Sequence, residues 1–245
     1  MNILILNASP KRKGGASAVF SSLLRLFLPF CQLSALPLRN SGDYEAALES
    51  LLWADAVVVS SPLYMDAAPS HMLPFLEQAE AMCREKSAHF HLYVLSNSGF
   101  VEGHQNELHL RLYEAWCQKA GIIWGGGLGI GGGVMLNWMC ILSPALALAG
   151  MAIEAVHVLT GAFSPNVFSA CYGGALITLA LCAGMLVSLG LLGCAIRRGT
   201  CRKNLYVRVL VPSFLFLPIA DAFMVISSLC RGILPHKLLR KEEIK

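Results

Sequence analysis

Apolar and polar positions follow two different periods in the first half of the chain. Short continuous apolar runs, typical of parallel strands covered on both faces, alternate with segments in which apolar residues recur at helical spacing. The runs predict strands over Ile3–Leu6, Cys31–Leu36, Ala54–Ser60, His89–Ser96 and Gly121–Ile130. The spaced segments predict helices over Ala16–Leu28, Asp43–Trp53, Ser70–Arg84 and Asn106–Lys119. This alternation predicts an α/β fold with a doubly wound parallel sheet of five strands.

The pattern changes after residue 133, where long apolar stretches replace the alternation. No charged residue occurs in the 39 residues from Val158 to Ile196. Within them, Gly173–Ile196 is long enough to cross a hydrocarbon core of about 30 Å, and Trp138–Leu159 is a second candidate span. Together they predict a helical membrane hairpin. A third stretch, Tyr206–Cys230, contains charged residues and prolines, and we expect it to form an interfacial or re-entrant helix.

The alternative for this apolar half is the core of a soluble domain or an interface between subunits. A surface helix of a soluble domain has a polar face. The stretch Gly173–Ile196 has only Thr178 and Ser188 as polar residues, so we favour the membrane. The sequence therefore predicts a domain over residues 1–133 and an apolar helical region over residues 134–245, and it leaves a homodimer open.

Composition and charge support this division. The chain is 56% hydrophobic and 14% charged, whereas a globular protein has about 25% charged residues. Residues 1–133 contain nine Lys and Arg against eleven Asp and Glu, and residues 134–245 contain ten against four. Basic residues from Arg197 to Lys203 follow the predicted hairpin, so the positive-inside rule places the first domain on the cytoplasmic side of a membrane. Basic residues are not interleaved with aromatic ones, which argues against nucleic-acid binding.

Three loops follow the first, third and fourth predicted strands: Asn7–Gly15, Ser61–Ala68 and Asn97–Gly103. In the strand order 2-1-3-4-5 these strand ends are neighbours, at the place where such sheets bind ligands. The first loop leads into a helix N-terminus, where free backbone N–H groups and Lys11 suit a phosphate. The second offers Tyr64 to a flat ring, and the third offers small polar residues and a glycine to the edge of that ring. A phosphate joined to a flat heteroaromatic ring is what FMN presents.

These loops and their flanks resemble the NADPH-dependent FMN reductase family of flavodoxin-like proteins. The resemblance covers about residues 1–133, through the motifs NASPKRKGGAS, SSPLYMDAAPSHMLPFLE and SNSGFVEGHQNELHLRLYEAWCQKAGIIWGGGLGIGGG. It implies a flavodoxin-like fold and an FMN site formed by Ser9, Lys11, Ser17, Pro62, Leu63, Tyr64, Met65, Ser96, Ser98 and Gly99. The family often has Asn-Thr where this chain has Gly15 and Ala16, so two phosphate-facing polar side chains are missing. The compact cysteine cluster of the family's iron–sulfur relatives is missing too.

By this resemblance we expect an NAD(P)H-dependent FMN oxidoreductase that passes electrons through bound flavin to an acceptor, such as a membrane-soluble quinone. The flavin supplies the redox chemistry, so no catalytic side chain is predicted. Two alternatives stay open. One is a membrane-anchored flavodoxin-like binding module without a cofactor, which Gly15 and Ala16 favour. The other is an electron carrier that serves partner proteins without using NAD(P)H.

We expect the remaining histidines, the cysteines and the glycine run to have structural roles and not to form binding sites. His104 and His109 flank the third loop and are expected to be solvated helix positions. His89 and His91 lack a third ligand nearby, and the nine cysteines form no C-x-x-C pair, so we predict no metal site. The glycine run from 125 to 133 does not open a helix in the first βαβ unit, so we expect a flexible exit from the sheet and not a dinucleotide site.

Overall fold

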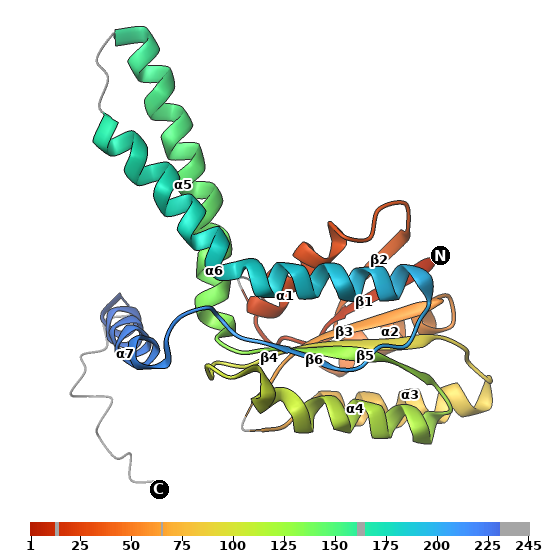
Figure 1. Ribbon diagram of the computed structural model, residues 1–245. Helices are drawn as coiled ribbons and strands as arrows, with labels where there is room; N and C mark the ends of the chain where they lie inside the picture. Colours follow the sequence, from red (N-terminus) through yellow and green to blue (C-terminus); the bar gives the residue numbers. More distant parts are fainter. Residues whose placement is uncertain (13–14, 65, 161–164, 231–245) are drawn as a thin grey trace, which may run out of the picture. The chain divides into compact units, whose positions relative to one another are not determined.

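The computed structural model describes residues 1–12, 15–64, 66–160 and 165–230, and its centre is one parallel sheet (Figure 1). The strands are β1 (Asn2–Asn7), β2 (Gln32–Pro37), β3 (Ala56–Pro62), β4 (His91–Asn97), β5 (Ile123–Ile130) and β6 (Leu205–Val207). They pair in the order β2-β1-β3-β4-β5-β6. The first five strands confirm the predicted doubly wound, flavodoxin-like fold class. The predicted number of strands is wrong, because the short edge strand β6 adds a sixth.

Helices cover both faces of this sheet. The helices of the described chain are α1 (Ala16–Arg25), α2 (Tyr44–Leu51), α3 (Met72–Glu85), α4 (Glu107–Ala120), α5 (Gly133–Thr160), α6 (Pro165–Arg198) and α7 (Ser213–Cys230), with short 3-10 turns at Ser41–Asp43 and Gly103–Asn106. Those that lie on the sheet are α1 to α4 and the C-terminal half of α6. Strand residues alternate between faces, so Leu4 and Leu6 pack with residues of α2, α3 and α4 in one hydrophobic core cluster. Helix α1 lies on the other face with the C-terminal half of α6 (Figure 1).

The first four glycines of the run, up to Gly129, belong to β5, and the last three lead directly into α5, so the expectation of a flexible exit over the whole run is wrong. The register with β4 shifts between Leu92 and Tyr93, which makes a bulge in β5. Gly125 lies against the Tyr93 ring, and Gly126 has a φ of +121° with its Cβ position 2.5 Å from the Arg202 carbonyl oxygen. Side chains at these positions would overlap β4 or the segment that returns to β6. The glycines let three chain segments approach closely.

Helix α6 is one continuous helix in two environments. Its C-terminal half buries Met185, Leu189 and Ile196, and the Tyr93 hydroxyl on β4 donates to the Ala195 carbonyl at 3.3 Å. Its N-terminal half pairs with α5 in a helical hairpin (Figure 1). The predicted span Gly173–Ile196 therefore covers part of the hairpin and part of the helical layer on the sheet.

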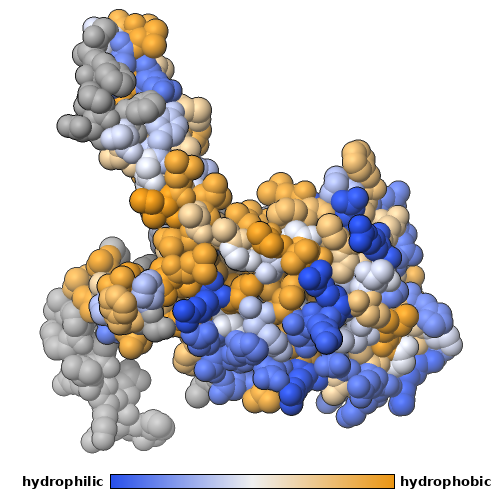
Figure 2. All heavy atoms as spheres, in the orientation of Figure 1, coloured by the Kyte–Doolittle hydropathy of each residue, from blue (hydrophilic) through white to orange (hydrophobic). Residues whose placement is uncertain are grey.

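Small residues bring the two hairpin helices together. The Ser143 hydroxyl donates to the Ala175 carbonyl at 3.0 Å, and Gly150 lies against the Tyr172 ring. Both helices are long and apolar enough to cross a membrane, and only 6% of the most apolar window of α5 is buried. Figure 2 shows apolar side chains over the lower part of the hairpin and its junction with the α/β domain. The exposed part of the hairpin nearest to the α/β domain is therefore apolar.

Residues Met1–Leu210 form one compact unit, and Val211–Lys245 form a second. In the second unit, α7 has several exposed apolar side chains, including Phe214 and Leu217. The predicted division at residue 133 stays a prediction. Within the first unit, α5, α6 and β6 all follow that position, and the C-terminal half of α6 and β6 complete the layers of the sheet.

Candidate functional site

Three loops meet at the carboxyl edge of the sheet, after β1, β3 and β4. Because these strands are adjacent, the loops are held together by hydrogen bonds between their ends. The Ala8 amide donates to the Ser60 carbonyl at 2.9 Å, and the Leu63 amide donates to the Asn97 carbonyl at 2.8 Å. The predicted neighbourhood of the three loops is therefore present in the described structure.

The loop after β1 folds around the start of α1. Gly15 is the N-cap, with extended backbone and no side-chain cap, and the first N–H groups of a helix have no intrahelical acceptor. A Cβ at Gly15 would lie 3.0 Å from Ser9 Oγ, so a side chain at position 15 would crowd Ser9. Lys11 is exposed beside it, and the Ser9 side chain is 4% exposed. The arrangement fits a phosphate bound by backbone N–H groups and a flexible cation.

Ser17 is a buried residue of α1 that forms hydrogen bonds to the ends of two strands. Ser17 is 1% exposed, and the side-chain amide nitrogen Nδ2 of Asn97 donates to Ser17 Oγ at 2.8 Å. The same amide donates to the Ser61 carbonyl at 3.3 Å, while Ser60 Oγ donates to the Ser17 carbonyl at 2.9 Å. Ser17 thus connects α1 to the ends of β3 and β4. Its predicted contact with phosphate stays a prediction, since this hydroxyl already accepts a hydrogen bond in the interior.

The loop after β4 rests on a buried polar network. Ser96 Oγ donates to Asn106 Oδ1 at 2.7 Å and lies 2.7 Å from His109 Nδ1. Since the single hydroxyl proton goes to Asn106, the imidazole donates through Nδ1–H. Asn106 Nδ2 donates to the Gly103 carbonyl at 3.0 Å and to Ser98 Oγ at 3.4 Å. The network fixes the path of the loop that contains Ser98 and Gly99.

His109 is 1% exposed, so its interpretation as a solvated position is wrong. It belongs to the apolar stripe of α4 with Leu110 and Tyr113, and that helical spacing was the signal in the sequence. His104 is exposed, as expected, and stacks on Tyr206 with ring centres 4.2 Å apart. The sequence interpretation also missed Asn97 and Asn106, which connect the loops.

The remaining predicted residues of the loops after β3 and β4 differ in their exposure. Tyr64 is 43% exposed and Phe100 is 57% exposed, and Gly99 is exposed between Phe100 and the buried Ser98. Pro62 and Leu63 are buried and continue β3. Met65 lies outside the described residues. Exposed aromatic rings of this kind can stack on a flat ring that is attached to a phosphate.

Burial lowers the pKa of His109 from its ordinary value of 6.5 to about 4. In the unfolded chain His109 binds a proton as the pH falls through 6.5, whereas in the folded protein it stays neutral down to about pH 4. Protonation therefore stabilises the unfolded state relative to the folded state between pH 6.5 and pH 4. We expect the free energy of unfolding to fall by about 3 kcal/mol over this window from His109 alone. Urea unfolding of His109→Gln should lack this component, whereas His89→Gln, at an exposed position, should keep it. Equal pH dependence in all three proteins would contradict the prediction.

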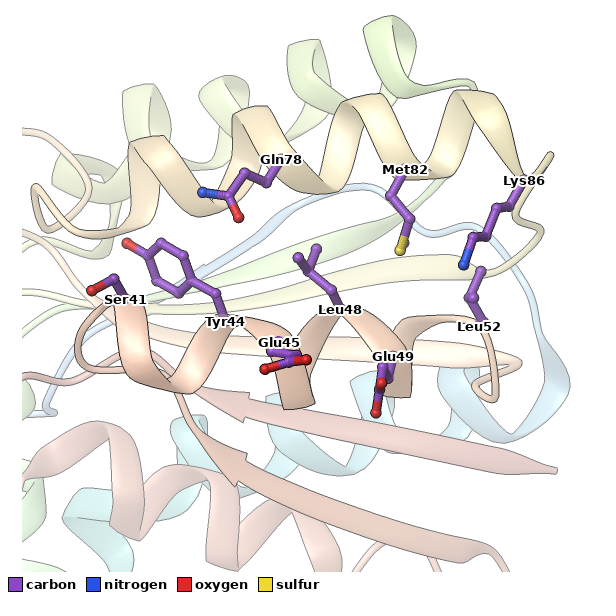
Figure 3. A pocket seen from close by; sticks show the side chains of 9 residues that line it. All are labelled: Ser41, Tyr44, Glu45, Leu48, Glu49, Leu52, Gln78, Met82 and Lys86. Carbon is purple, nitrogen blue, oxygen red and sulfur yellow. The ribbon is translucent and has the colours of Figure 1, made fainter.

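A cleft of about 420 Å³ lies elsewhere, between α2 and α3 (Figure 3). Tyr44, Leu48 and Met82 point into it, and Glu45 and Glu49 lie on its rim. It contains none of the residues of the three loops. Among the described residues, no group of His, Cys, Asp and Glu side chains could hold a metal ion.

No protein family and no curated protein matches this sequence. Solved structures with a similar chain path include the Trp repressor binding protein from Bacillus subtilis, at 16% identity and a TM-score of 0.44, over 53% of this chain and 84% of that one. An NADPH-quinone reductase from P. pentosaceus has 20% identity and a TM-score of 0.44, over 54% of this chain and 86% of that one. Identities and TM-scores are low, so the fold assignment rests on the strand order and not on these similarities.

Proposed function

We propose that this chain is a membrane-anchored flavoprotein oxidoreductase that binds FMN at the carboxyl edge of its sheet and accepts electrons from NAD(P)H. One observation carries the proposal: the uncapped start of α1, the exposed Lys11 and the exposed Tyr64 belong to neighbouring loops at the switch point of a doubly wound sheet. A bound flavin would supply hydride and electron transfer. The chain's own residues bind and orient it.

Each loop has a separate role in this proposal. The backbone N–H groups at the start of α1 and the Lys11 ammonium would hold the phosphate. Tyr64 would cover one part of the ring, and the backbone at Gly99 would approach its polar edge. Ser17, Ser96 and Ser98 keep these groups in place through the buried hydrogen bonds, because their hydroxyls are already used in the interior.

The hairpin supports membrane association. Both ends of the hairpin return to the same α/β unit, and α5 starts directly after the carboxyl end of β5. The segment of α6 from Pro165 to Gly184 spans about 30 Å, which matches a hydrocarbon core. We therefore place the second crossing here, toward the N-terminus of the predicted span Gly173–Ile196.

This placement changes the charge argument for orientation. Arg197 and Arg198 end the half of α6 that packs on the sheet, and Gly199 lies near His91 at the start of β4. These arginines are therefore at the amino edge of the sheet, away from the hairpin. Lys11 and Arg12 are exposed at the carboxyl edge, on the hairpin side. A cytoplasmic location for the domain stays a proposal, and these two residues now support it.

The position of the hairpin also suggests where the electron acceptor comes from. Because α5 starts beside the three loops, a bilayer around the hairpin would face the edge of the sheet at which we place the flavin. A lipid-soluble acceptor such as a quinone could then reach the ring without leaving the membrane.

An anaerobic absorbance spectrum of the detergent-purified protein tests the proposal. We expect bound FMN that is bleached when NADPH or NADH is added. Flavin that stays oxidised with either nucleotide would favour an electron carrier. A folded protein that retains no flavin would overturn the oxidoreductase and leave the membrane-anchored binding module.

Replacing Lys11 by alanine should weaken FMN binding by about 10- to 100-fold, since a hydrogen bond to a charged group contributes about 1.5–3 kcal/mol. Fluorescence quenching of free FMN during titration measures the dissociation constant. The matched control is Lys86→Ala, at the cleft between α2 and α3, which should bind FMN like the wild type. Equal affinity in Lys11→Ala and the wild type would remove Lys11 from the site.

A further inference from the structure

Two cysteines meet where the hairpin joins the α/β domain. The side chains of Cys140 on α5 and Cys182 on α6 lie within interaction distance of each other. Both line a small cavity that is bounded by Leu23 of α1 and otherwise by residues of the hairpin helices. Cys182 is 2% exposed and Cys140 is half-buried. The two thiols therefore face each other at a partly accessible position.

The packing of the hairpin keeps the two backbones close at this level. A disulfide requires Cα atoms about 4.4–6.8 Å apart, and small residues permit such an approach between helices. The Ser143 hydroxyl reaches the Ala175 carbonyl across the interface at 3.0 Å, and a Cβ at Gly174 would lie 3.1 Å from Leu146. These contacts continue the interface to which Cys140 and Cys182 belong.

Proline at position 144 makes α5 adaptable at Cys140. Pro144 lies inside the helix and has no N–H group, so the Cys140 carbonyl lacks its usual helical donor. Helices bend most readily at such a position. The Cys140 sulfur can therefore adjust toward Cys182 without breaking further backbone hydrogen bonds.

We propose that Cys140 and Cys182 are a redox-active dithiol that closes to a disulfide when it meets a peroxide. The Cys140 sulfur attacks one peroxide oxygen, the O–O bond breaks, and a sulfenic acid and one molecule of water form. The Cys182 sulfur then attacks the sulfenic sulfur, and a second water leaves as the S–S bond forms. Hydrogen peroxide is thereby reduced to two molecules of water, and the two thiols are oxidised and lose two hydrogens.

The order of these steps follows from exposure. Cys140 is the more accessible thiol and meets the oxidant, whereas the buried Cys182 resolves the intermediate. The product links α5 to α6 at the base of the hairpin. This inference does not depend on flavin binding, because it rests on contacts within the hairpin.

The test oxidises the full-length detergent-purified protein with hydrogen peroxide, blocks remaining thiols and identifies linked peptides by mass spectrometry. We expect a peptide pair joined through Cys140 and Cys182, which reduction separates. Cys171 and Cys194, on the same helix α6, should remain reduced and be found alkylated. Alkylation of Cys140 and Cys182 to the same extent as Cys194, without a linked pair, would overturn the proposal.

Two single variants and one designed pair distinguish the outcomes. Cys182→Ser should accumulate a sulfenic acid on Cys140 that dimedone traps, while Cys171→Ser should form the native link. A designed pair, Ser143→Cys with Ala175→Cys in a chain lacking Cys140 and Cys182, lies about one turn along α5 and about two turns along α6 at the same interface. If the designed pair closes under peroxide and the native pair does not, Cys140 and Cys182 are not a redox pair.

Discussion

Replacing both Leu148 and Leu176 by arginine is expected to transfer the protein from the membrane fraction to the soluble or aggregated fraction. The two leucines are 62% and 66% exposed, near the middle of the exposed parts of α5 and α6. An arginine at the centre of a membrane helix costs about 2.5–3.5 kcal/mol, so the pair costs about 6 kcal/mol. Membranes washed with carbonate and then blotted for the protein measure the fraction retained.

Leu108→Arg is the matched control, because Leu108 is 64% exposed on α4 of the α/β domain. It should leave the protein in the membrane fraction. Retention of the double variant like the wild type would contradict the crossing. Recovery of the wild type without detergent, in a folded state, would place the hairpin in a soluble interface instead.

Replacing Gly126 by alanine is expected to lower the free energy of unfolding by about 4 kcal/mol, from backbone strain and overlap together. Its φ of +121° is unfavourable for any residue with a Cβ, and that Cβ would lie 2.5 Å from the Arg202 carbonyl oxygen. For a unit of this size, the loss corresponds to a melting temperature lower by about 10 °C. Thermal unfolding in detergent, followed by circular dichroism, measures the change.

Substitutions at two other glycines separate the contribution of backbone strain from that of steric overlap. Gly121 has a φ of +73° with open space around it, so Gly121→Ala should cost about 1 kcal/mol from the backbone alone. Gly184 is in α6 with nothing near its Cβ position, so Gly184→Ala should be neutral or slightly stabilising. If Gly126→Ala melts like Gly121→Ala, the return segment at Arg202 moves freely and the bulge tolerates a side chain.

Local sequence patterns were sufficient for the five main strands and for the helices that alternate with them. The period of the apolar residues and the residues that end a helix or strand determine such elements. The predicted ranges Ala54–Ser60 and Asn106–Lys119 therefore agree to within two residues with β3 and α4. Strand β6 was missed because three residues give no periodic signal. Its existence depends on pairing with β5, where Leu128 lies opposite Leu205.

The sequence by itself thus determined the fold class, the neighbourhood of the three loops and the presence of long apolar helices, because all three follow from periodicity and chain order. Only the tertiary structure decided which loop side chains are free. The hydroxyls of Ser17 and Ser96 bond to Asn97, Asn106 and His109 in the interior, and their predicted contacts with FMN stay predictions. It also divided α6 between hairpin and sheet, since an apolar helix face has the same composition whether lipid or a β-sheet covers it.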